Sequence, residues 1–182
     1  EQIAEMASLD RIDIAIATGS HELFRKYVLL PCYQWHRQIV VPVGHPLAQI
    51  KKPTLKQLAQ YPIVTYVFSF TGPSSLQQIF SKAGLTPNVA LTARDADVIK
   101  TYVGLGLGVG ILAEMAFDPL RDDTLAALPA SHRFEGNTTR IAFRRDLWLR
   151  GYDYDFMELL APQLTRRTVE ATLKGEGADP GL

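Results

Sequence analysis

Short apolar stretches alternate with helical patterns along most of this chain, and this alternation constrains the fold more than any other feature. β-Branched and apolar runs bounded by turn residues predict strands at 12–17, 27–33, 38–43, 63–67, 89–92, 109–112, 125–128 and 140–144. Helical spacing and capping residues predict helices at 2–9, 55–60, from 71–75 to 83, 95–103 and 147–160. Strands that alternate with helices indicate an α/β fold that contains parallel sheet.

The number of short strands favours two small α/β units over one sheet. Two units imply a cleft between them, which is the usual place for a small ligand. The nearly continuous apolar run 12–17 also predicts a strand buried on both faces, as in parallel sheets.

Composition excludes several classes of protein. The 182 residues carry 19 basic and 19 acidic side chains, so the chain lacks the basic excess with which a nucleic-acid-binding module neutralises phosphates. The single Cys32 excludes a disulfide framework and fits a reducing compartment. Apolar stretches such as 105–115 fall short of the ~20 residues that a membrane span needs. Because the chain opens inside a helical pattern without Met, we expect it to be part of a longer protein.

No motif for catalysis, metal binding or nucleotide binding is supported by the sequence around it. The glycines at 104, 106, 108 and 110 follow a predicted helix and precede a strand, whereas the dinucleotide fingerprint runs from strand to helix. The four histidines have no metal-ligand spacing, and no nucleophile–base pair can be assembled. We therefore expect neither an enzyme nor a metal or cofactor site.

Polar residues at two element ends are suited to an anion. The segment Thr71–Ser75 opens a predicted helix, where unpaired backbone N–H groups attract negative charge; plain N-capping is the alternative. Thr18 ends a predicted strand, where open α/β sheets bind ligands, although turn chemistry explains it equally. Trp35, between two predicted strands, lines a cleft or is an ordinary core or surface aromatic.

Several segments together resemble the effector-binding region of LysR-type transcriptional regulators, in the CysB and Cbl branch that governs sulfur assimilation and sulfonate use. The segments that carry the resemblance are Asp13–Thr18, Leu30–Trp35, Gly44–Leu47, Leu58–Gly72, Asp95–Gly110 and Phe143–Arg145. The resemblance implies a type II periplasmic-binding-protein-like fold of two Rossmann-like α/β subdomains, truncated at the N-terminus. It divides the chain into an incomplete subdomain I, at 1–32 plus 135–182, and a subdomain II at 33–134.

The resemblance also implies a site between the subdomains for a sulfate-like anion. Thr18 and Thr71, with Gly72, match family residues that bind the anion through hydroxyls and helix N-terminal amides. Trp35 matches an aromatic residue near the cleft. Ser74 is assigned to the site only because it lies at the start of the predicted helix. Pro73 departs from the family pattern, because close relatives have a basic residue there.

We therefore expect the effector-sensing part of a cytoplasmic regulator that forms dimers or tetramers through such domains. DNA would be bound only through an N-terminal helix-turn-helix domain that this chain lacks, and no contact with a membrane is expected. Sulfate, adenosine phosphosulfate, an acetylserine-like compound and a sulfonate stay open as the effector. A periplasmic solute-binding protein for a small anion is the alternative that shares the fold.

Overall fold

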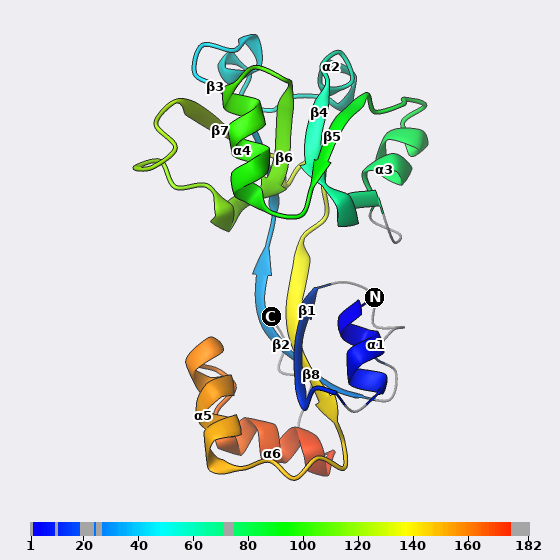
Figure 1. The fold of residues 1–182 in the computed structure, drawn as a ribbon, viewed down its shortest axis with the longest axis vertical. Coiled ribbons are helices and arrows are strands. Elements are labelled where there is room, and N and C mark those ends of the chain that lie inside the picture. The colour runs from blue at the N-terminus through cyan, green and yellow to red at the C-terminus, as the bar shows by residue number, and fades with distance from the viewer. Residues whose placement is uncertain (1, 10, 19–23, 25–26, 71–74, 176–182) are drawn as a thin grey trace. The chain divides into compact units, whose positions relative to one another are not determined.

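The chain crosses twice between two units, after Gln34 and after Gly136. The first unit comprises Glu1–Gln34 with Asn137–Leu182, and the second comprises Trp35–Gly136. The computed structural model describes residues 2–9, 11–18, 24, 27–70 and 75–175, and Figure 1 shows the elements of each unit.

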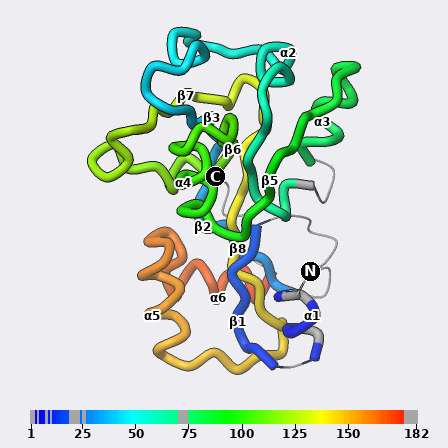
Figure 2. The backbone as a smooth tube through the Cα atoms, turned by 45° about the horizontal axis from the view of Figure 1, so that its top comes forward, coloured from blue at the N-terminus to red at the C-terminus, as the bar shows by residue number. Residues whose placement is uncertain are grey.

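The first unit contains a three-stranded sheet in the order β1-β8-β2. Its strands are β1 (Ile14–Thr18), β2 (Tyr27–Trp35) and β8 (Asn137–Arg144). Its helices are α1 (Gln2–Ser8), α5 (Gly151–Leu160) and α6 (Arg166–Lys174). Helix α1 lies beside β1, while α5 and α6 lie together on the other side of the sheet in Figures 1 and 2. The core between this sheet and α5–α6 includes Leu30, Ile141, Phe143, Met157 and Val169.

The structure corrects one expectation for the first unit. Strand β1 was predicted to be buried on both faces, as in parallel sheets. It pairs antiparallel with β8 and is the first strand in the order β1-β8-β2. Its burial alternates, since Ala15 is buried whereas Ile16 is 38% exposed. The apolar run reflects β propensity at a strand that is covered mainly on one face.

The second unit contains a five-stranded mixed sheet in the order β5-β4-β6-β3-β7. Its strands are β3 (Arg37–Pro42), β4 (Ile63–Tyr66), β5 (Val89–Ala93), β6 (Val109–Ala113) and β7 (Leu125–Pro129). Strand β4 runs parallel to β5 and β6, whereas β3 runs antiparallel to β6 and β7.

Helices cover both faces of this second sheet. The α-helices are α2 (Leu55–Leu58), α3 (Leu76–Lys82) and α4 (Ala96–Gly104), and the 3-10 turns are η2 (Pro46–Gln49), η3 (Val67–Phe70) and η4 (Glu114–Ala116). Leu58 and Phe80, from α2 and α3, pack on one face of the sheet. Ile99 and Val103, from α4, pack on the other face. Among the described residues, no helix has the length and hydropathy needed to cross a membrane.

Capping chemistry fixes several helix starts where the sequence predicted them. Thr54 and Gln57 form a reciprocal capping box at α2, and the Asp95 carboxylate accepts the Val98 N–H at 2.9 Å to begin α4. The helix predicted at 147–160 begins later, at Gly151. Helix α6 was not predicted, because the expected pattern stopped at Pro162; Thr165 caps it by accepting the Thr168 N–H.

The glycine-rich segment makes a tight connection from α4 to β6, as its order in the sequence predicted. Gly106 has a φ of 81°, a left-handed conformation that favours glycine. A Cβ added at Gly108 would lie 2.2 Å from the Pro62 carbonyl oxygen. The same oxygen accepts the Val109 N–H at 2.8 Å, so the strand cannot move away without losing that bond.

We expect Gly108→Ala to lower the free energy of unfolding by about 2 kcal/mol or more, because the added methyl group overlaps backbone atoms. Gly104→Ala is the matched control, since its new Cβ would meet only the Leu125 Cδ2 atom at 3.9 Å. Urea unfolding of both variants provides the measurement. Equal stability of the two variants would contradict the close packing at Pro62.

Candidate functional site

Two threonine hydroxyls meet at the carboxyl end of β1. Thr18 and Thr139 are directly opposed in the antiparallel pair of β1 and β8, so their side chains project from the same face. Their Oγ1 atoms are 2.7 Å apart, a hydrogen bond between residues 121 positions apart. Thr139 is only 4% exposed, whereas Thr18 is exposed. Thr18 is therefore the exposed member of the hydrogen-bonded pair, and Thr139 is the buried one.

The other predicted site residues have different outcomes. Thr71, Gly72 and Ser74 lie outside the described residues and stay predictions. Trp35 ends β2 and is 9% exposed, so it belongs to a strand instead of lying between two strands. Helix α3 begins at Leu76, and the Ser75 hydroxyl caps it by accepting the Gln78 N–H at 3.3 Å.

Buried hydroxyls fix the backbone that leads toward residues 71–74. The Thr65 hydroxyl, at the end of β4, donates to the Ile111 carbonyl at 2.8 Å and lies 3.3 Å from the Ser69 hydroxyl. Both residues are at most 1% exposed. These hydroxyls join β4, β6 and η3, and no local sequence pattern predicts them, because the bond from Thr65 to Ile111 spans 46 positions along the chain.

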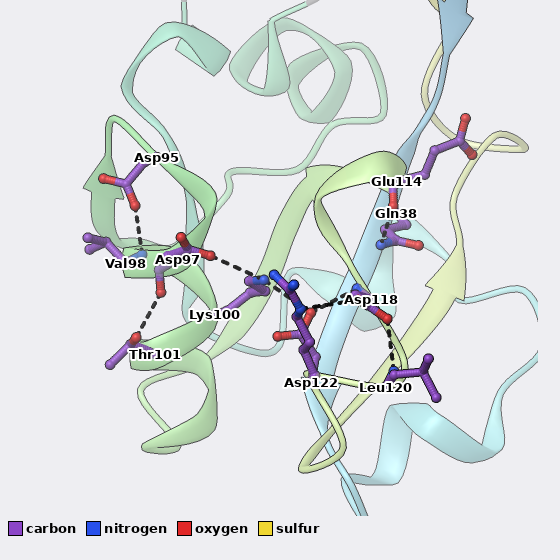
Figure 3. Close-up of polar contacts among 11 residues, drawn as sticks. Gln38, Asp95, Asp97, Val98, Lys100, Thr101, Glu114, Asp118, Leu120 and Asp122 are labelled. Carbon is purple, nitrogen blue, oxygen red and sulfur yellow. Dashed lines mark hydrogen bonds and ion pairs between the residues drawn. The ribbon is translucent and has the colours of Figure 1, made fainter.

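A charge cluster joins α4 to the loop before β7, and Figure 3 shows it. The Lys100 Nζ atom lies 3.1 Å from Asp122 Oδ2 and 3.2 Å from Asp97 Oδ1. Asp122 also accepts the Asp118 N–H at 2.9 Å. Burial raises the pKa of the Asp122 carboxyl, but the Asp118 N–H and the Lys100 ammonium outweigh it and hold this pKa below its ordinary value. Because Lys100 is engaged by two carboxylates, the cluster is structural.

Cysteine and histidine side chains have structural roles where the structure describes them. Cys32 is buried, and burial raises the pKa of its thiol, which keeps it protonated and unreactive. His45 caps η2 by accepting the Leu47 N–H at 3.2 Å, and burial lowers its pKa. Within the described ranges, no group of three or more potential metal ligands occurs.

The described residues form a two-unit α/β protein in which exposed Thr18 ends β1 and is hydrogen-bonded to buried Thr139. Residues 1–165 match the family model described as the LysR substrate binding domain. The chain belongs to this family.

Curated relatives and a solved structure are similar over nearly the whole chain. The HTH-type transcriptional regulators CysB and SsuR of Burkholderia cenocepacia are 49% and 46% identical, each over 96% of this chain and 56% of the relative. The chain thus spans about half the length of these relatives. The crystal structure of the cofactor-binding domain of the Cbl transcriptional regulator superposes with a TM-score of 0.83 at 34% identity, over 94% of this chain and 75% of that chain.

These findings confirm the resemblance to the CysB and Cbl branch and the type II periplasmic-binding-like α/β fold. The relatives are named as transcriptional regulators and not as enzymes, which confirms the expectation for this chain. The same names do not favour the alternative of a solute-binding protein. Sequence reasoning missed Thr139. Strand alternation offered the signal, since Thr139 shares a face with Ile141 and Phe143 in the segment 137–144.

We expect Asp122→Asn to destabilise the protein by about 1 to 2 kcal/mol at pH 7, because it removes a charged acceptor from Lys100 and Asp118. The lowered carboxyl pKa means that this contribution is complete above the unfolded pKa of about 4 and disappears as pH falls through the folded value. The difference from wild type should therefore shrink at low pH.

Urea unfolding at neutral and acidic pH measures this difference. Asp123→Asn is the control, because that neighbouring exposed residue makes none of the contacts described above. A difference between Asp122→Asn and wild type that is constant with pH would contradict the role given to the ionised carboxylate.

Proposed function

We propose that this chain is the effector-sensing domain of a LysR-type transcriptional regulator of sulfur metabolism and that it binds a small sulfate-like anion. The accessible Thr18 hydroxyl, supported by buried Thr139 at the carboxyl end of β1, carries this proposal. The proposal is also supported by relatives named CysB, SsuR and Cbl, at 36–50% identity. A periplasmic-binding-like fold binds ligands at the strand ends of its two units, and Thr18 is such a residue.

Neutral donors suit an oxyanion that is fully ionised at neutral pH. A threonine hydroxyl and a backbone N–H donate hydrogen bonds without adding a buried countercharge, and such charge-assisted bonds are stronger than neutral ones. In this proposal Thr18 supplies one hydroxyl, and Thr71, Gly72 and Ser74 supply further donors. Trp35 lines the same site. The effector is a sulfate-class anion, with adenosine phosphosulfate, a sulfonate or an acetylserine-like compound as the other candidates.

Anion binding would act on transcription through the arrangement of the whole protein. The ligand must prefer one arrangement of the two units or of the subunits over another, since equal affinity for both would change nothing. Dimers or tetramers formed through these domains would then hold their DNA-binding domains differently. Those domains lie in the part of the relatives that this chain does not cover, and such a regulator acts on DNA in the cytoplasm.

We expect Thr18→Val and Thr71→Val each to weaken sulfate binding by the full-length protein roughly tenfold, because each removes one hydrogen bond to a charged group. Isothermal titration calorimetry with sulfate provides the affinity, and thermal unfolding without ligand should change little. A thermal-shift panel of the four candidate compounds then identifies the effector class. Thr172→Val, on α6, is the control for the loss of a threonine hydroxyl that is not among the proposed site residues.

Unaltered sulfate affinity in both variants would remove Thr18 and Thr71 from the site. If none of the four compounds binds the wild-type protein, the proposed sulfur-metabolite effector is wrong.

A further inference from the structure

We propose that Thr18, Thr139 and Asn137 form one donor row for an oxyanion, with Thr139 positioning the Thr18 hydroxyl and the Asn137 amide contacting the anion directly. This proposal rests on the proposed function and adds two residues to its site. Neither of them was among the residues that the sequence predicted for anion binding.

A change from apolar to polar side chains along one face of the first sheet locates the row. Side chains that are opposite or two residues apart in antiparallel strands share a face. Ile14 opposes Phe143 and Ile16 opposes Ile141, so this face begins as an apolar surface. Both β8 members of these pairs are completely buried, in the core that α5 and α6 cover.

The next step along the same face is polar. Thr18 opposes Thr139, and Asn137 follows two residues further along β8. On β8 this face is buried from Phe143 to Thr139, and the buried Thr139 requires a hydrogen-bond partner, because burying a polar group without one costs stability. The three side chains carry no charge, so the row offers hydrogen bonds without a countercharge.

The direction of the hydrogen bond in the hydroxyl pair decides whether the Thr18 hydrogen can reach a ligand, and either oxygen can be the donor. Each hydroxyl has one hydrogen, and a single bond between the two Oγ1 atoms uses one of them. When Thr139 donates to Thr18, the Thr18 hydrogen is available to an external acceptor. Since an oxyanion can only accept, its binding selects this orientation, and Thr139 acts through Thr18 as a positioning residue.

The Asn137 side chain supplies the independent observation. Its Nδ2 atom is buried and has no hydrogen-bond partner among the residues that the structure describes. A buried amide donor without an acceptor destabilises the folded protein. Native proteins usually satisfy such a group with ordered water or a ligand. Asn137 lies on the face of the Thr18–Thr139 pair, so an anion oxygen that accepts hydrogen bonds from both Thr18 and Asn137 satisfies this amide.

Sulfate titrations of full-length variants test the row. We expect Thr139→Val to weaken sulfate binding several-fold to tenfold, because the Thr18 oxygen loses its donor, while Thr139→Ser restores near wild-type affinity. Asn137→Ala should weaken binding several-fold. Asn137→Asp should weaken it further, because a carboxylate repels the anion and accepts hydrogen bonds instead of donating them.

Thr138→Val is the matched control, since Thr138 lies on the same strand but projects from the opposite face. Its sulfate affinity should equal that of wild type, and thermal unfolding of every variant without ligand checks that the fold is kept. A purely structural role for Thr139 predicts lower stability with unchanged sulfate affinity in the folded protein.

The two levels of the proposal fail differently. If Thr18→Val weakens sulfate binding while Thr139→Val and both Asn137 variants bind like wild type, the donor row is wrong and the proposed function stands. If Thr139→Ser is as weak as Thr139→Val, positioning by the hydroxyl is wrong. If wild-type protein binds no sulfate, both the row and the sulfate-like effector are wrong.

Discussion

The antiparallel pairing of β1 with β8 is the constraint on which the first unit depends. It joins strands separated by more than a hundred residues, because the whole second unit lies between them in the chain. Three structural features require this pairing: the strand order β1-β8-β2, the core under α5 and α6, and the hydroxyl pair of Thr18 and Thr139. Closing so long a loop has an entropic cost that rises only slowly with length, so two short strands and a shared apolar face suffice.

The second unit is built differently and depends on local signals. Its helices begin at capping residues that lie three positions from their partners, as Thr54 does with Gln57 and Asp95 with Val98. Its turn at Gly108 is fixed by contact with Pro62, and the Lys100 ammonium is paired with Asp97 and Asp122. These contacts all lie within the second unit.

The same contrast explains what could be predicted from the sequence. Capping boxes, glycine turns and strand runs are local patterns, so the α/β class, the start of α4 and the connection at 104–110 were predictable. The antiparallel direction of β1 was not, because its apolar run fits a parallel or an antiparallel neighbour equally. Thr139 could not be linked to Thr18 for the same reason: the register between two distant strands decides that contact. Helix α6 was missed because Pro162 masked a separate start at Thr165.

A hydroxyl that is hydrogen-bonded to a second, buried hydroxyl binds an anion in a direction-dependent way, which a lysine in a sensor would not do. A lysine ammonium attracts any anion in either arrangement of the protein, whereas a hydroxyl binds strongly only when its hydrogen points at the acceptor. In the proposed donor row, Thr139 sets that direction by donating to the Thr18 oxygen, and Thr139 itself is only 4% exposed. A ligand-driven switch requires the anion to bind one arrangement of the protein more tightly than another. That difference in affinity then depends on how many such directed donors contact the anion at once. An uncharged donor row makes affinity depend on geometry more than on long-range attraction, so small rearrangements of the strand end change the occupancy of the site.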